Sequence, residues 1–476
     1  MMKRFTLVSC FILLAAKGFS QQFSQYNTGT LYDSFENPSQ HAFIPDTSKE
    51  YAFNFLIPNF NANFFLTGNV QASLVNRAFG GKYNNSDLVI GGNKFNNANI
   101  SASAYELMFK VFSSLKGNTE IGFFMQTKVE GRGNFSDESV ALFNGSGAFS
   151  NDVYDNIFND HYYYQIYNSI GLSYREQITP RLAFGVKLGF LLGVDYSKLD
   201  IYQSHISFDN ENNTATLSLQ GKYYQSKGPG NFDLRSFLPI IRSPGAQITM
   251  GSSYVTDDHV TIQMNVKDLG FIHWYSQSAI ANFNGTEVIK DINGKRREDS
   301  VFTKVKNILN DQKKVASFTS PTNSRLEVSA SKTYYLDDDL FFKYSPTLVG
   351  AKELWYNGYT GALVNRFEYK NKYNLSLTGS YDNFNLFNLG LQFMLKAPNG
   401  EFYIGTDRLL KTEALAVASR SYASYANGSF TGADFFLGFS LKFGPVIEHP
   451  LNASTIPNGE RGFLGRLYNR LFKTYW

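Results

Sequence analysis

Six histidines and a single cysteine are the residues of this chain best suited to metal binding or nucleophilic chemistry. The histidines lie too far apart in the sequence for a common metal-ligand spacing; they are His41, His161, His205, His259, His273 and His449. The sequence contains no HExxH, Walker or CxxC motif. The cysteine, Cys10, lies within the first 20 residues, which resemble a cleavable leader. We therefore expect no metal, no cofactor and no thiol chemistry in the mature chain.

Two smaller groups have two interpretations each. His205 and Ser207 share one face of an expected strand. They could be the catalytic pair of a hydrolytic barrel, or they could be ordinary polar residues of the lumen or a loop. The run 337–339 is three aspartates, which could bind calcium or form a solvated hairpin turn. Polar positions and turns are the commoner outcome for such residues. We expect that the chain is not an enzyme.

Charged residues inside apolar, alternating segments are more informative. A charge that faces lipid at the middle of a bilayer costs about 2–4 kcal/mol, so these side chains must face inward or lie near an interface. The candidates for the lumen are Gln126, Lys128, Glu130, Arg132, Lys187 and Asp195. They would form either an ion-pair network that fills the lumen or a lining that selects solutes.

The elements that position these residues are long alternating strands. Apolar side chains alternate with polar or small ones over 119–132, 182–195 and 435–443. Runs of this length exceed the usual strand of about 5–6 residues and suit a tilted crossing of a bilayer. Aromatic residues make up 16% of the chain, as the girdles of such a protein require. The pattern predicts an all-β transmembrane antiparallel β-barrel of about 14 to 16 strands in the cell outer membrane.

The chain divides into four predicted parts. Residues 1–20 resemble a secretory signal peptide, with Lys3 and Arg4 before an apolar stretch. Residues 21–50 form an N-terminal arm that folds into the barrel mouth or lumen, 51–443 form the barrel, and 444–476 form a periplasmic tail. Removal of the leader lowers the formal charge from +4 by the charges of Lys3, Arg4 and Lys17. The small remaining charge gives no indication of nucleic-acid binding.

Within the barrel, Pro58 is expected to separate strands at 51–57 and 59–70. Residues 76–97 and 133–160 are predicted to be loops, and 104–115 fits a helix or a strand. Strands at 181–197 and 199–209 are expected to be separate. Apolar spacing within 291–314 predicts an amphipathic helix in a loop or in the lumen, and 433–443 is the expected closing strand.

The tail carries a second amphipathic pattern. Residues 459–476 have one apolar and one basic helical face, with the candidate membrane or partner contacts Phe463, Arg466, Leu467, Arg470, Leu471 and Phe472. Such a helix suits the surface of the outer-membrane lipid or a periplasmic or secretion-complex protein. It could also pack across the barrel opening, and the sequence leaves these alternatives open.

Three short segments resemble a known family. They are Asn37-Pro38-Ser39, the run 268–274 (DLGFIHW) and the run 403–409 (YIGTDRL). Together they are similar to an uncharacterised family of outer-membrane barrels from bacteria with type IX secretion. That family resembles the long-chain fatty-acid transporter barrels and the barrel subunits that accompany type IX secretion. The resemblance implies a fourteen-stranded barrel with an N-terminal segment near the lumen, and it supplies no catalytic residue.

Two functions remain after these exclusions. One is a transport or channel barrel for small or apolar solutes. The alternative is a non-conducting barrel that scaffolds a secretion or surface-attachment complex. An open lumen would favour the first, and a lumen filled by the arm and the loop helix would favour the second.

Overall fold

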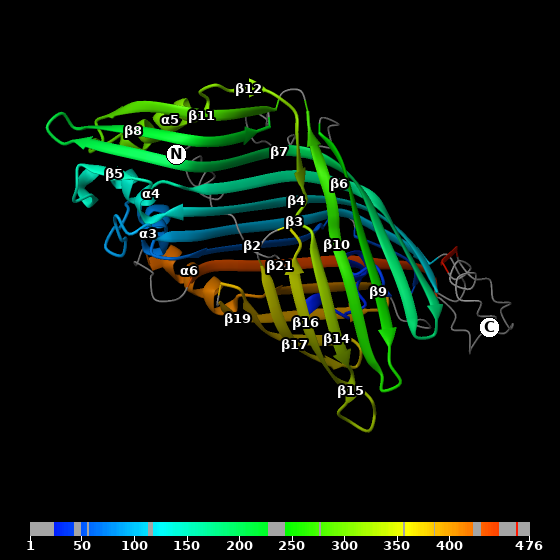
Figure 1. Cartoon of the computed structure of the whole chain (residues 1–476). Coiled ribbons are helices and arrows are strands. Elements are labelled where there is room, and N and C mark those ends of the chain that lie inside the picture. The colour runs from blue at the N-terminus through cyan, green and yellow to red at the C-terminus, as the bar shows by residue number, and fades with distance from the viewer. Residues whose placement is uncertain are drawn as a thin grey trace.

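The computed structural model is a closed transmembrane barrel in which the described residues supply 14 antiparallel spans (Figure 1). The structure describes residues 23–41, 49–54, 57–112, 118–226, 243–275, 278–355, 358–384, 386–421, 430–446 and 463–464. The barrel closes because the last strand, β21 (Phe430–Val446), pairs with β1 (Lys49–Asn54) and β2 (Asn59–Thr67). No helix in the described ranges is long and apolar enough to cross a membrane.

Most spans are single strands. These are β3 (Phe95–Phe112), β4 (Thr119–Ser136), β6 (His161–Thr179), β7 (Leu182–Asp209), β10 (Val260–Trp274), β16 (Phe342–Glu353), β17 (Tyr359–Tyr369), β18 (Tyr373–Asp382), β19 (Phe387–Ala397), β20 (Gly400–Thr406) and β21. The ambiguous segment 104–115 lies largely in β3 and is therefore a strand as far as Phe112. The predicted closing strand is confirmed, with β21 longer at both ends than the predicted 433–443.

The other spans consist of two strands in line. β1 and β2 both pair with β3 and β21, so the two predicted N-terminal strands form one span interrupted near Pro58. β8 (Thr214–Gln225) and β9 (Pro244–Val255) both pair with β7, and β13 (Phe318–Pro321) and β14 (Arg325–Lys332) both pair with β10. The expected strands on either side of Pro58 are present as β1 and β2, although both end earlier than predicted. Their arrangement in line was not predicted, because a proline can interrupt hydrogen bonding without reversing the chain.

The two ends of the barrel differ in their connections. At one end, which we call the turn end, adjacent spans join within a few residues, as between β6 and β7, β17 and β18, and β19 and β20. At the other end, the loop end, the connections include α3 (Gln71–Gly80), α4 (Asp137–Ala141), η2 (Leu142–Asn144), η3 (Ser146–Ala148), α5 (Arg297–Leu309) and α6 (Leu409–Ser421). Helix α3 lies partly in the predicted loop 76–97, and helix α6 was not predicted.

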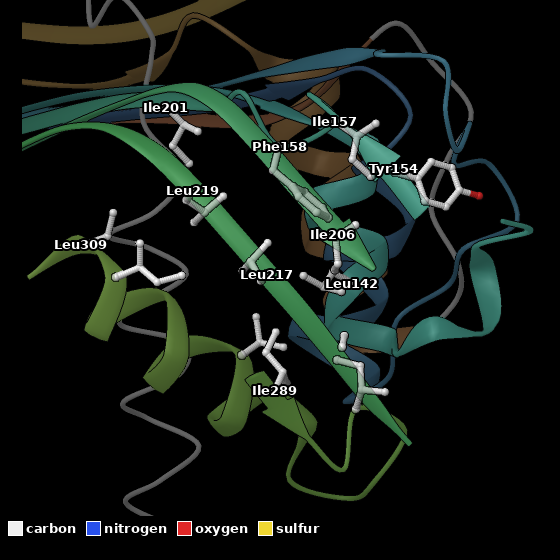
Figure 2. Close-up of a cluster of buried hydrophobic side chains, with 14 of the residues drawn as sticks. Leu142, Tyr154, Ile157, Phe158, Ile201, Ile206, Leu217, Leu219, Ile289 and Leu309 are labelled. Carbon is white, nitrogen blue, oxygen red and sulfur yellow. The ribbon is translucent and has the colours of Figure 1, made fainter. Parts of the chain in front are cut away.

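At the loop end, part of the sheet extends beyond the barrel. β7 continues for 28 residues, so the predicted break between 181–197 and 199–209 was wrong. The C-terminal part of β7 pairs with β5 (Val153–Asp155) and β8. In turn, β8 pairs with β11 (Ala279–Lys290), and β11 pairs with the short strand β12 (Lys314–Val315). The predicted helix within 291–314 is α5. It covers this sheet rather than the lumen, and Figure 2 shows the buried side chains that join them, among them Leu217, Ile289 and Leu309.

Exposure along the strands follows the alternation in the sequence. In β18, Leu375 and Leu377 are exposed, whereas Ser376 and Thr378 between them are buried. In β7, Leu188 is 55% exposed and its neighbour Lys187 is 1% exposed. Successive side chains of a strand point to opposite faces, so an apolar surface surrounds a polar interior.

Residues 23–41 lie inside the barrel, and we call them the plug (Figure 1). The plug contains a short 3-10 helix, η1 (Phe23–Gln25), and one helix, α2 (Leu31–Glu36). Thr30 caps α2 by accepting a hydrogen bond from the Asp33 amide, and Asn37 ends it before Pro38. Of the predicted arm 21–50, residues 23–41 lie in the lumen, whereas Lys49 and Glu50 already belong to β1 of the wall.

The tail helix was predicted for 459–476. Within that range the structure describes Phe463 and Leu464, which are helical, and Phe463 is exposed. The other candidate contacts of the tail, Arg466, Leu467, Arg470, Leu471 and Phe472, lie outside the described residues. Their role stays a prediction.

Candidate functional site

The plug contacts spans on opposite sides of the barrel. The Leu31 amide donates to Glu401 Oε1 of β20 at 2.6 Å, and Tyr105 of β3 donates to Glu36 Oε1 at 2.7 Å. On another side, Arg175 Nε of β6 donates to the Ser39 carbonyl at 2.9 Å, and Gln263 Nε2 of β10 donates to Asn27 Oδ1 at 2.6 Å. The plug therefore binds the wall at several places around its circumference.

Wall glycines make room for the plug. A Cβ atom at Gly185 of β7 would lie 2.0 Å from the carbonyl oxygen of Pro38 and 2.6 Å from the Ser39 nitrogen. A Cβ at its cross-strand partner on β9, Gly251, would lie 2.3 Å from Asn265 Oδ1 of the wall and 3.2 Å from Ser39 Oγ of the plug. A Cβ at Gly122 of β4 would lie 2.7 Å from the ring of Phe35. These three positions form a seat that fits the plug only because they lack side chains.

The segment Asn37-Pro38-Ser39 is the part of the plug that occupies this seat. Asn37 Oδ1 accepts from Asn265 Nδ2 at 3.1 Å, and Asn37 Nδ2 donates to Asp33 Oδ1 at 2.6 Å. This segment was singled out in the sequence by resemblance alone. The structure gives it a physical role, which is to hold the end of α2 against the wall.

A cluster of buried charges surrounds Glu36 at the end of α2. Lys267 Nζ lies 3.9 Å from Glu36 Oε2 and 2.6 Å from Glu327 Oε2, and Arg325 lies 3.8 Å from Glu36 and also contacts Glu327. Tyr26 of the plug donates to the same Glu327 carboxylate. We call these four charged residues the latch. None of them was predicted, although Lys267, Arg325 and Glu327 occupy inward positions of alternating strands.

A narrow polar cavity borders the latch. Its empty space, including the part open to solvent, is about 470 Å³, and its lining includes Tyr32, Glu36, Asn61, Gln126, Lys128, Glu130, Asp268 and Arg325. Lys128 Nζ donates to Asp268 Oδ2 at 2.5 Å, so this pair is neutral overall. Gln126 Oε1 and Asn61 Oδ1 are buried acceptors without a protein donor in the described part. Polar solutes or water suit such a lining.

The six lumen candidates from the sequence lie in three settings: along the cavity, in contact with other wall residues near it, and apart from both. Gln126, Lys128 and Glu130 line the cavity, and Glu130 accepts from Gln165 and Tyr167, both at 2.7 Å. Arg132 pairs with Glu353 of β16, and Lys187 Nζ donates to Tyr105 OH at 3.0 Å. Asp195 lies apart from them and accepts from Tyr164 and Ser226, both at 2.9 Å.

The other candidate groups of the sequence lie away from the plug. His205 Nδ1 lies 2.7 Å from Asp155 Oδ1 on the exposed sheet at the loop end. Asp337 accepts from the Phe341 and Phe342 amides in the turn before β16, as a hairpin aspartate does. Within the described ranges, no group of His, Cys, Asp and Glu residues is arranged to hold a metal ion.

The latch leads to a prediction for Glu36. We expect Glu36→Gln to loosen the plug, because Lys267 and Arg325 would then share the single carboxylate of Glu327. The loss should be smaller than the about 3–5 kcal/mol that a buried charge left with no partner costs. The plug residue Ser34 is fully buried, and the only cysteine of the sequence, Cys10, lies in the predicted leader, so Ser34→Cys is a clean probe once Cys10 is replaced by serine. Maleimide should label Ser34→Cys slowly alone and faster together with Glu36→Gln. Equal labelling rates would show that the latch does not hold the plug.

A comparison of the sequence with protein-family models assigns the chain to a family. Residues 42–407 match the model of a family described as a family of unknown function, DUF5723. The chain belongs to this family. No curated protein matches it in sequence.

Solved structures similar to this DUF5723 barrel are outer-membrane proteins. The toluene transporter TodX of Pseudomonas putida is 7% identical, with 91% of this chain and 96% of that chain covered and a TM-score of 0.40. A FadL homologue of Pseudomonas aeruginosa is 11% identical, with 88% and 95% covered and a TM-score of 0.40. The monoaromatic hydrocarbon channel CymD is 9% identical, with 90% and 95% covered and a TM-score of 0.38. No functional residue is carried over from these proteins.

Proposed function

We propose that this chain is an outer-membrane transport barrel whose plug closes the lumen and whose movement opens it to small solutes. The turn end would face the periplasm and the loop end the exterior, as short turns and long loops do in bacterial barrels. Part of the contact between plug and wall is apolar, because Leu31, Tyr32 and Phe35 pack with wall residues in a buried cluster. The observation that carries the proposal is the polar remainder of this contact.

Several atoms in that contact have no protein partner among the described residues. They include both amide atoms of the Gln25 side chain, Ser39 Oγ, Asn265 Oδ1 and Gln247 Oε1, all in buried residues. Buried polar groups of this kind are normally bonded to ordered water. A hydrated contact can separate at lower cost than a dry apolar core, because its polar groups are solvated in both states.

The lining also favours one class of solute. The cavity beside Glu36 is bordered by charged, amide and hydroxyl side chains. Transfer of a hydrocarbon into such a space would desolvate these groups without replacing their hydrogen bonds. Of the two solute classes suggested by the sequence, we therefore favour small polar solutes over apolar ones, although similar barrels are named for hydrocarbons.

One observation supports the alternative of a non-conducting scaffold. Glu36 of the plug lies 3.9 Å from Lys267 and 3.8 Å from Arg325 of the wall, and breaking a buried ion pair is costly. The scaffold would keep its plug seated permanently, whereas the transporter would release it.

Removal of the plug separates the two functions. A variant that lacks residues 23–41 should let small sugars swell liposomes much faster than the full chain does, because nothing else described fills the seat. Faster migration of the unheated sample on a denaturing gel would show that the variant is still a folded barrel. A folded variant that gives no more swelling than the full chain would contradict the transport function.

A further inference from the structure

Two cations of the wall hold the plug through neutral acceptors. The Arg366 guanidinium of β17 donates to the Asn27 carbonyl, and Lys396 Nζ of β19 donates to the Thr28 carbonyl. β18 lies between these two strands and pairs with both. A carbonyl oxygen carries no net charge, so the plug gives each cation a hydrogen bond without a counter-ion.

The carboxylates around these cations have closer partners. Three of them attract Arg366 or Lys396 at longer range; they are Glu368, 3.5 Å from Lys343 Nζ, Glu401, 3.0 Å from Lys442 Nζ, and Asp33, which accepts from the Thr28 amide at 2.9 Å. No ion pair joins Arg366 or Lys396 to a carboxylate in the described part of the chain. Both cations therefore lack a directly bound anion.

A row of polar side chains beside Arg366 also lacks partners. Ser376 of β18 is the cross-strand partner of Arg366, and Gln392 of β19 is the cross-strand partner of Ser376. Both are 1% exposed at inward positions, and the Ser376 hydroxyl and the Gln392 amide have no hydrogen-bond partner within the described ranges. The same holds for Arg366 Nε and for both amide atoms of Asn374 on β18. Buried polar groups without partners are destabilising, so a polar ligand would stabilise this row.

The chemistry of the row suits a phosphate group. A guanidinium can bind two oxygens of a phosphate at once, and a lysine ammonium adds a point charge. The hydroxyl of Ser376 and the amide nitrogens of Asn374 and Gln392 are further donors for the remaining oxygens. The amide oxygens need a donor themselves, which the P–O–H group of a protonated phosphate supplies and sulfate does not.

We propose that Arg366, Lys396, Ser376 and Gln392 form a binding site for the phosphate group of a small solute, and that binding there releases the plug. In the seated state η1 packs against β17, β18 and β19, so phosphate and plug compete for the same part of the wall. A ligand that binds only the unseated state raises the ratio of unseated to seated plugs. The inference rests on the proposed function, because it requires a plug that moves.

Labelling of the plug in the full-length barrel tests the site. In a Cys10→Ser/Ser34→Cys barrel, maleimide reaches the buried position 34 when the plug leaves the wall. We expect phosphate to raise the labelling rate about tenfold at about ten times Kd, whereas sulfate at equal ionic strength should leave it unchanged. Equal rates in phosphate and sulfate would mean that no phosphate site acts on the plug, and they would overturn the proposal.

Two substitutions test the location of the site. Arg366→Gln removes a cation, and Gln392→Leu removes an amide that has no partner in the seated barrel, so each should raise the phosphate concentration needed for a given rate about tenfold. The control Lys372→Gln removes a cation from the exposed turn between β17 and β18 and should respond as the native protein does. An undiminished response in both site variants would overturn the assignment. If Arg366→Gln does not fold, Gln392→Leu decides, because it breaks no bond of the seated plug.

Failure of this inference is distinguishable from failure of the proposed function. Liposome swelling after removal of residues 23–41 tests transport and needs no phosphate site. A barrel that conducts without its plug, but whose labelling does not respond to phosphate, would overturn this inference alone.

Discussion

Gly185→Val should hold the plug out of its seat and leave the barrel open. A Cβ at this position would lie 2.0 Å from the Pro38 carbonyl oxygen, and both partners of the clash belong to backbone that cannot rotate away. Overpacking of this kind costs about 1–3 kcal/mol. Each 1.4 kcal/mol shifts the ratio of seated to unseated plugs about tenfold. Cells that express the variant should become sensitive to a bulky antibiotic that the outer membrane normally excludes.

The matched control is Gly350→Val. Gly350 lies on β16, and no atom lies within 4 Å of the Cβ it would gain. The two substitutions add the same side chain to a strand glycine, so they share any general cost of valine in the barrel. Equal antibiotic sensitivity of the two strains, with equal amounts of folded barrel, would refute the seat at Gly185.

Leu188→Arg should block assembly of the barrel, whereas Lys187→Gln should not. Leu188 is 55% exposed on the outer face of β7, and a cation there at the bilayer midplane costs about 2–4 kcal/mol. Lys187 is buried, and its Nζ donates to Tyr105 OH, which a glutamine amide can also do. The measurement is the amount of heat-modifiable barrel in the membrane fraction. If both variants assemble equally, the outer face of β7 does not lie at the membrane centre.

The barrel could be predicted from the sequence because its signal is local. Alternation along a strand depends only on neighbouring residues, so the faces of Lys187 and Leu188 follow directly from their positions. The in-line spans could not be predicted in this way. β8 and β9 pair with the same edge of β7, which lies far from β9 in the sequence. A proline or an Asn-rich run can mark either a reversal of the chain or a break within one span, and the local sequence does not distinguish the two.

The site depends on contacts that one sequence does not reveal. Lys267 and Glu327 meet through the pairing of β10 with β14, and only the folding of the plug into the lumen brings Glu36 beside them. The seat is built from the absence of side chains at Gly122, Gly185 and Gly251, and the sequence contains 39 glycines. The inward candidates Lys128 and Glu130 were identifiable because a charge in an apolar strand has few acceptable positions.

The central claim is that movement of the plug opens the lumen, and a reversible tether tests it most directly. In the double variant Ser39→Cys/Gly251→Cys, the position of Ser39 Oγ, 3.2 Å from the new Cβ, suits a disulfide between plug and wall. The mature sequence has no other cysteine. In a planar bilayer, the oxidised barrel should stay closed, and reduction should produce single-channel openings. A barrel that conducts equally when oxidised and reduced, or that never opens after reduction, would contradict the account.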